Sequence, residues 1–259
     1  MTPARERLAA AIAAASKEGE PALVAYLTAG HPRRESFREH VAAIAAAADV
    51  VEIGVPFSDP MADGVTIQGS SRAALAQGVT LRWILAELAA MPRVPAPLVL
   101  MSYLNPLLAF GYDALAETAS RAGVCGFIVP DLPFDEGDDL RVSLGRQGLA
   151  LVQMVTPVTT PGRLRAVCAI SEGFVYAVTS TGTTGRRAAL PEDIRAYLAT
   201  VRAASSVPVC AGFGIRTREH VAALRGQVDG VIVGSALVEV LAGGADPAEF
   251  LRGLRTGRA

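Results

Sequence analysis

The sequence has little lysine, little cysteine and no excess of either charge. Lys17 is the only lysine, and the 24 basic and 25 acidic residues give a formal net charge of −1. The arginines are scattered, so no basic patch for nucleic acid is predicted. Cys125, Cys168 and Cys210 lie far apart and form no CxxC pair, and the three histidines add no pair of metal ligands. We therefore expect neither a disulfide framework nor a metal site, and a reducing cytoplasm fits best.

Long apolar runs are absent as well. No apolar run approaches the roughly 18 residues that cross a bilayer, so no membrane-spanning segment is predicted. Arg5 and Arg7 precede the apolar stretch Leu8–Ala15, but Glu6 interrupts the basic end and residues 16–18 are polar. An opening surface helix is therefore favoured over a signal peptide. Hydrophobic residues make up 51% of the chain and charged residues 19%, which excludes a disordered chain.

Short apolar segments alternate along the chain with longer, alanine-rich amphipathic segments. The predicted strands are Ala22–Ala29, Val50–Val55, Pro97–Tyr103, Gly126–Val129, Ala150–Thr156, Phe174–Thr179, Pro208–Gly212 and Gly230–Val233. The predicted helices between them include Arg34–Ala48, Thr66–Gln77, Tyr112–Ala122, Asp135–Gln147, Pro161–Ile170, Pro191–Ala204 and Arg218–Leu224. Because the strands are nearly continuous apolar runs, they are typical of parallel strands covered by helices.

Eight strand–helix units predict an α/β fold, a single-domain (β/α)8 TIM barrel over residues 1–259 with an extra N-terminal helix. A doubly wound open sheet is the structural alternative. That fold usually carries a GxGxxG turn after its first strand, and Thr28–Pro32 does not match it. No linker or low-complexity stretch divides the chain. In a barrel the active site is predicted at the C-terminal ends of the strands.

Glu52 stands within the apolar strand Val50–Val55. An unpaired buried carboxylate is costly, so the fold must solvate this group, pair it or use it. If burial raises its pKa, Glu52 can both give and take a proton near neutral pH. The alternative is a structural glutamate that bonds to neighbouring backbone or hydroxyl groups.

The segment Pro56–Gly64, which follows this strand, is a long polar loop that contains two carboxylates, Asp59 and Asp63. Loops at this face of a barrel commonly carry ligand contacts. Each aspartate by itself is explained by turn chemistry, since Asp59 precedes a proline and Asp63 precedes a glycine. The combination of a strand glutamate with this loop favours a functional site.

Glycine-rich segments follow the last three predicted strands, at Ser180–Arg187, Gly212–Ile215 and Gly234–Ala236. Glycine lets backbone N–H groups approach a phosphate, and a short helix that begins at Ser235 would add its dipole. This corner is the recurrent phosphate site of barrels. Since turns also need glycine, a purely structural role is the alternative.

The segment Val51–Gly64 resembles the signature of the tryptophan synthase alpha chain family. The likeness continues over nearly the full length through Tyr26–Pro32, Met101–Pro106, Val129–Pro133, Thr181–Gly185, Gly212–Ile215 and Gly234–Ala236. The resemblance implies cleavage of indole-3-glycerol phosphate to indole and glyceraldehyde 3-phosphate, with no metal or organic cofactor in this chain. It also implies a tryptophan synthase beta chain as partner in an alpha2beta2 complex. There the beta chain holds pyridoxal phosphate and receives indole through an internal tunnel.

The resemblance also implies roles for individual residues. Glu52 corresponds to the general acid/base, and Asp63 to the carboxylate that steadies the indole nitrogen. Asp59 and its loop correspond to a mobile region that faces the beta chain. The implied substrate-binding positions are Tyr103, Tyr176, Gly185, Phe213, Gly214, Gly234 and Ser235.

Two residues depart from the pattern of some family members, His31 where aspartate occurs and Ser180 where arginine occurs. Both are predicted in loops, where the family varies, so we expect them to affect subunit contacts more than the chemistry. Two other functions remain open. One is a stand-alone indole-3-glycerol phosphate lyase, and the other is a non-catalytic subunit that only activates its beta chain. The presence of both carboxylates argues against the second.

Overall fold

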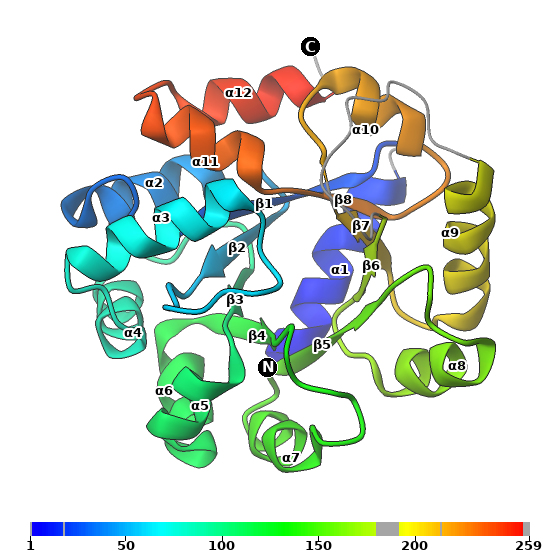
Figure 1. Cartoon of the computed structure of the whole chain (residues 1–259), viewed down its shortest axis with the longest axis horizontal. Coiled ribbons are helices and arrows are strands. Elements are labelled where there is room, and N and C mark those ends of the chain that lie inside the picture. The colour runs from blue at the N-terminus through cyan, green and yellow to red at the C-terminus, as the bar shows by residue number, and fades with distance from the viewer. Residues whose placement is uncertain (1, 18, 180–191, 213, 256–259) are drawn as a thin grey trace.

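The protein is a closed barrel of eight parallel strands. The computed structural model describes residues 2–17, 19–179, 192–212 and 214–255. The strands pair in chain order from β1 to β8, and β8 pairs with β1 to close the barrel (Figure 1). They are β1 (Ala22–Thr28), β2 (Val50–Gly54), β3 (Leu98–Met101), β4 (Val124–Ile128), β5 (Ala150–Val155), β6 (Val175–Val178), β7 (Val209–Gly212) and β8 (Gly230–Val233). The TIM-barrel prediction and its eight strands are confirmed.

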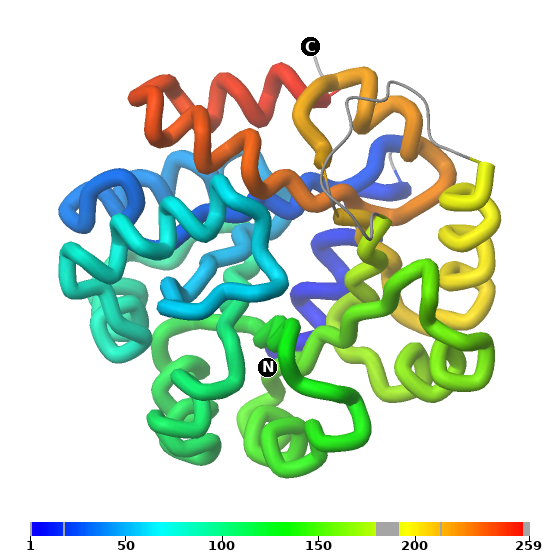
Figure 2. Tube along the Cα trace, viewed as in Figure 1, coloured from blue at the N-terminus to red at the C-terminus, as the bar shows by residue number. Residues whose placement is uncertain are grey.

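Helices surround the barrel, and Figure 2 traces the chain from strand to helix around it. They are α1 (Ala4–Lys17), α2 (Phe37–Ala45), α3 (Val65–Ala76), α4 (Leu81–Ala90), α5 (Leu104–Phe110), α6 (Tyr112–Ala122), α7 (Asp138–Arg146), α8 (Pro161–Ile170), α9 (Glu192–Ala204), α10 (Arg218–Leu224), α11 (Ser235–Ala242) and α12 (Pro247–Leu254). The predicted helix Arg34–Ala48 divides into a 3₁₀ turn, Arg34–Ser36, and α2. The sequence reasoning missed α4, α5 and α12, although Thr80 caps α4 by accepting a hydrogen bond from the Trp83 N–H.

Apolar side chains form two clusters, one on each side of the strands. The larger cluster lies between the strands and the surrounding helices. The smaller one fills the lumen and contains short or branched side chains such as Ala22, Val24, Val99 and Ala150. Successive side chains of a strand point to opposite faces, so both clusters draw on the same eight strands. This explains the nearly continuous apolar runs in the sequence.

Helix α1 covers the N-terminal end of the lumen and lies behind the strands in Figure 1. Leu8 and Ile12 are fully buried and belong to the lumen cluster. The Arg7 guanidinium donates a hydrogen bond to Cys125 Sγ at 3.2 Å. The sequence predicted a surface helix here. That description fits the polar face of α1, but the other face is part of the barrel core.

Two glycines at strand ends make room for two tyrosines. A Cβ atom on Gly54 would lie 2.1 Å from the Tyr26 hydroxyl, and one on Gly212 would lie 2.4 Å from the Tyr176 hydroxyl. Atoms cannot approach so closely, so any larger residue would displace the tyrosine. The glycines therefore fix how Tyr26 and Tyr176 occupy the C-terminal end of the lumen.

Three carboxylates brace the opposite, N-terminal end of the barrel. Each accepts a hydrogen bond from the first part of a neighbouring strand: Asp49 from Leu23 N–H at 2.7 Å, Glu172 from Leu151 N–H at 3.2 Å and Asp229 from Val209 N–H at 2.8 Å. Each also pairs with an arginine, namely Arg255, Arg5 and Arg202. We call each of these carboxylate–arginine pairs a bracket. The three brackets join strand backbone to helices and to the C-terminal segment.

The bracket at Asp49 differs from the others because it is buried. The side chains of Arg255 and Asp49 are only 8% and 15% exposed, whereas those of Arg202 and Asp229 are 42% and 22% exposed. We expect Arg255→Met to lower the free energy of unfolding by about 3 kcal/mol, because it leaves a buried carboxylate unpaired. Arg202→Met is the matched control and should cost less than about 1 kcal/mol. Urea unfolding followed by circular dichroism measures both, and equal losses would contradict this account.

Candidate active site

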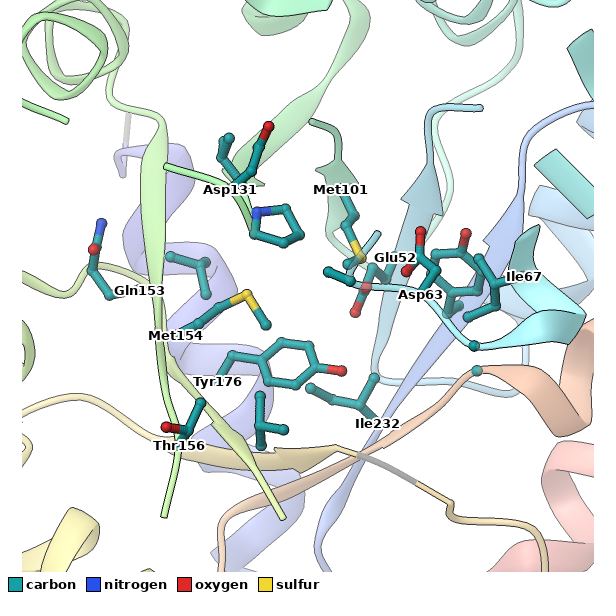
Figure 3. Close-up of a pocket in the computed structure, with 18 of the residues that line it drawn as sticks. Glu52, Asp63, Ile67, Met101, Asp131, Gln153, Met154, Thr156, Tyr176 and Ile232 are labelled. Atoms are coloured by element: carbon teal, nitrogen blue, oxygen red, sulfur yellow. The ribbon is translucent and has the colours of Figure 1, made fainter. Parts of the chain in front are cut away.

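The C-terminal ends of the strands surround a cavity of about 820 Å³ (Figure 3). A barrel is expected to carry its active site at this face. The predicted site residues that line the cavity are Glu52, Asp63, Tyr176, Gly214, Gly234 and Ser235. The other predicted positions Gly185 and Phe213, and the departure at Ser180, lie outside the described residues. The other departure, His31, follows β1 and is not among the residues that line the cavity.

Glu52 lies in the middle of β2, level with Tyr26 on β1 and Val99 on β3. It is 1% exposed, and within the described part of the chain its carboxyl group has no hydrogen-bond partner. Burial raises the pKa of Glu52 to about 8, and the nearby charge of Asp63 acts in the same direction. The carboxyl group is therefore protonated at neutral pH. A structural glutamate would be hydrogen-bonded, so the geometry favours a functional one.

Asp63 lies in the loop between β2 and α3 and is held by hydrogen bonds. The Tyr103 hydroxyl donates to Asp63 Oδ2 at 3.2 Å, and the Gln68 amide donates to the Asp63 backbone oxygen at 2.9 Å. Burial raises the pKa of Asp63 to about 6, and the bond from Tyr103 opposes that rise. Asp63 is therefore mainly ionised at neutral pH. The site thus combines one neutral and one charged carboxyl group, as acid/base chemistry often requires.

Tyr103 supports the Asp63 loop. Its hydroxyl accepts a hydrogen bond from the Ala62 N–H at 2.9 Å, and its ring stacks on Phe57 with 5.0 Å between the ring centres. The resemblance assigned Tyr103 to substrate binding, yet it is not among the residues that line the cavity. In the structure its contacts position Asp63.

A second part of the cavity has the features of an anion site. Gly214 adopts a φ of +79°, which side chains other than glycine rarely reach. Gly234 caps the N-terminus of α11, whose first residues Ser235 and Ala236 line the cavity. The first N–H groups of a helix have no partner within the helix, and its dipole favours negative charge there. The corner can therefore bind a phosphate through backbone groups.

Arg216, which the sequence reasoning missed, stands at the edge of this corner. Its guanidinium makes two hydrogen bonds to Glu239, at 2.8 and 2.6 Å, and the Thr66 hydroxyl donates to the same carboxylate at 3.2 Å. Because Thr66 lies in the first turn of α3, three residues after Asp63, this group joins the end of the Asp63 loop to α11. No local sequence motif predicts this group, since its three residues are far apart in the chain.

Tyr26 was also missed as a site residue. It lines the cavity, and its hydroxyl lies 3.2 Å from the Thr28 hydroxyl, which in turn lies 2.6 Å from that of Ser70. The argument that identified Glu52 would have found Tyr26, because both place a polar group in an otherwise apolar strand.

Among the residues that the structure describes, no three histidine, cysteine or acidic side chains are grouped so that they could hold a metal ion. Within the same residues, none of the helices is both long and apolar enough to span a membrane.

Comparison with known proteins gives one consistent family. The family model described as tryptophan synthase alpha chain matches residues 12–252. The tryptophan synthase alpha chain of Nitratidesulfovibrio vulgaris strain DP4 is 46% identical over 248 residues, which cover 95% of this chain and 96% of that protein. The one from Carboxydothermus hydrogenoformans is 44% identical over 237 residues, with 91% and 89% covered.

Solved structures agree with this result. A structure of Mycobacterium tuberculosis tryptophan synthase matches with a TM-score of 0.89 and 36% identity, covering 96% of both chains. The alpha subunit of tryptophan synthase from Legionella pneumophila strain Paris matches with a TM-score of 0.85 and 30% identity, again covering 96% of both chains. Together with the paired carboxyl groups at the mouth of the barrel, these matches show that the chain belongs to the tryptophan synthase alpha chain family.

Proposed function

We propose that this chain is a carbon–carbon lyase that cleaves indole-3-glycerol phosphate to indole and glyceraldehyde 3-phosphate. The observation that carries the proposal is the pairing of a buried, protonated Glu52 with an ionised Asp63 at one cavity. Figure 3 shows both carboxyl groups at the same side of that cavity. Membership of the family supports the same reaction, because its name refers to tryptophan synthesis.

The first chemical step is protonation of the indole ring at C3. Indole is a poor leaving group until C3 gains a proton, after which the ring becomes an iminium-like electron sink. Glu52 is suited to supply this proton because its pKa of about 8 keeps it protonated at neutral pH. The wall around it is apolar, with Val99 and Ile232 in the same lumen cluster, so the acid is shielded from bulk water.

Asp63 stabilises the charge that this protonation creates. Its carboxylate accepts the hydrogen bond of the indole N1–H while positive charge develops on that nitrogen. Tyr103 and Gln68 hold the aspartate and its backbone in place before the reaction, so little reorganisation is needed. An ionised group is required here, which agrees with its pKa of about 6.

The second step breaks the carbon–carbon bond. Removal of the proton from the side-chain hydroxyl next to the ring turns that carbon into the aldehyde of glyceraldehyde 3-phosphate. The electron pair of the broken bond returns to the indole ring and neutralises it. Glu52, which has lost its proton in the first step, serves as the base, so it ends the cycle protonated. The substrate phosphate lies in the corner formed by Gly214, Gly234 and Ser235.

We expect Glu52→Gln to reduce indole release by about 100-fold or more, since the amide keeps the shape and removes the titrating proton. A single-turnover assay with indole-3-glycerol phosphate measures this. Calorimetry with glycerol phosphate serves as the control and should show unchanged affinity. A folded Glu52→Gln protein with near-normal turnover would show that the acid is another group.

The pH dependence of kcat/KM should be bell-shaped. Activity needs Asp63 ionised, so it should fall as pH drops below about 6. It also needs Glu52 protonated, so it should fall as pH rises above about 8. Asp63→Asn should lower the activity and remove the acid limb of the remaining profile. A profile that stays flat from about pH 5 to about pH 9, a range that includes both pKa values, would contradict the assigned roles.

We propose further that this chain works with a tryptophan synthase beta chain, the partner that holds pyridoxal phosphate. The family name implies such a partner. Two exposed apolar side chains flank Asp63 in the chain: Met61 is 85% exposed and Val65 is 83% exposed. Leu108 on α5 is also exposed, and α5 begins directly after Tyr103. Isolated exposed apolar residues are common, but two of them beside a catalytic aspartate in the chain and a third on the helix that follows Tyr103 support a docking surface at this edge of the cavity.

Adding the beta chain should increase the rate of indole release by the isolated chain, and Leu108→Ser should weaken the complex about five- to tenfold by removing buried apolar area. Val142→Ser on α7 is the matched control, since Val142 is 54% exposed and Leu108 is 52% exposed. Calorimetry and the indole assay measure both effects. Equal rates with and without the beta chain would instead support a stand-alone lyase.

A further inference from the structure

The cavity extends beyond the space that the proposed reaction uses. One region, which we name the α7–α8 lobe, is lined by Phe134, Gly137, Leu151, Gln153, Arg163 and Val167. It is continuous with the catalytic part around the end of β5, where Met154 and Thr156 line the cavity. A total volume of about 820 Å³ is near the upper end of the roughly 300–1,000 Å³ of pockets that bury drug-sized ligands.

Strand β5 separates the α7–α8 lobe from the catalytic groups. Val152 belongs to the lumen cluster, whereas Leu151 belongs to the cluster between the strands and the helices. The alternation of a strand therefore places Gln153 on the outer side with Leu151. Figure 3 shows Gln153 and Met154 on opposite sides of β5, with Met154 directed toward Tyr176. The lobe is thus a distinct site on the far side of this strand.

The side chain of Gln153 has no explanation in the packing around it. It is 7% exposed, and its amide makes no hydrogen bond to any residue in the described ranges. Its amide atoms are not among the fully buried polar atoms that lack a partner, so they face the open space of the cavity. An amide offers both a donor and an acceptor to a ligand there. The amide is therefore placed to bond to something that occupies the lobe.

The other lining residues define the chemistry of that occupant. Leu151, Val167 and the ring of Phe134 offer apolar surface. Gly137 has no side chain, and a Cβ atom there would come within 3.6 Å of Leu151 Cδ2, so the glycine leaves one wall open. A largely apolar molecule with a flat ring fits such walls, because it can pack against the Phe134 ring.

The one charged side chain that lines the lobe already has a partner of opposite charge. Arg163 is the one charged residue among the six that define it, and it forms an ion pair with Asp135 at 3.2 Å. Its guanidinium also lies over the Phe134 ring, 4.5 Å from the ring centre. The other five residues of the lobe are uncharged, so a charged ligand would find no free partner of opposite charge among them. A neutral ligand is therefore favoured.

We propose that the α7–α8 lobe is a second ligand site, which binds a small neutral aromatic molecule through an N–H group that donates to Gln153 Oε1. Indole belongs to this class. That indole is released into the same cavity rests on the proposed function. The second binding site itself depends only on the residues of the α7–α8 lobe. A molecule bound there would lie across β5 from Glu52 and would leave the catalytic groups accessible.

The test is a titration of the isolated protein with indole and with 1-methylindole, which lacks the N–H donor. Methyl NMR separates the two regions, because Leu151 and Val167 report on the lobe and Ile232 reports on the catalytic part. We expect the Leu151 and Val167 signals to shift with indole. The affinity measured from these signals should be about three- to tenfold weaker for 1-methylindole, because one hydrogen bond is lost.

Two variants decide the role of the amide. Gln153→Leu keeps the space and should make the two ligands bind with equal affinity. Gln153→Phe fills the lobe and should abolish the Leu151 and Val167 shifts while the Ile232 shifts remain. If Gln153→Phe does not fold, Gln153→Leu still decides.

Two results in the unsubstituted protein would overturn the proposal, namely indole shifts confined to Ile232 or equal affinity for the two ligands at the lobe. Persistence of the lobe shifts in Gln153→Phe would overturn it too. Cleavage of indole-3-glycerol phosphate is assayed separately. A chain without that activity would refute the proposed function and leave the methyl titration fully interpretable.

Discussion

A closed barrel of eight strands must fill its own lumen with side chains, and this requirement shapes every functional feature of the protein. The lower lumen is filled by short apolar residues and by Leu8 and Ile12 of α1. At the C-terminal end the filling changes to Tyr26 and Tyr176, with Glu52 on the strand beside Tyr26. The burial that stabilises the barrel is thus also the desolvation that raises the pKa of Glu52. Acid strength and fold stability have one physical origin here.

The different protonation states of Glu52 and Asp63 follow from where each residue is attached. Glu52 is part of a strand, so its carboxyl group cannot leave the lumen, and no described residue bonds to it. Asp63 is on a loop, where Tyr103 can reach it with a hydroxyl group. The fold therefore separates the two pKa values through burial, which raises both, and through the hydrogen bond from Tyr103, which opposes the rise at Asp63 alone.

The sequence predicts what depends on local pattern and misses what depends on contacts across the chain. All eight strands were predicted because lumen and helix contacts make each one a continuous apolar run. Helices α4 and α5 were missed because each shares one connection with a second helix, so the simple strand–helix alternation is broken. Glu52 stands out as a charge among apolar neighbours. The contact of Tyr103 with Asp63 joins residues 40 positions apart, and no pattern along the chain predicts this contact.

The three carboxylate brackets lie at the N-terminal end of the barrel, and the cavity opens at the other end. The two faces therefore carry separate tasks, one for stability and one for ligands. This separation has a practical use for attaching the protein to a solid support or a sensor surface. A tether joined through the bracket face would leave the cavity open to solution. It would have to start beyond Arg255, so that the guanidinium still reaches Asp49 and the Ala47 carbonyl.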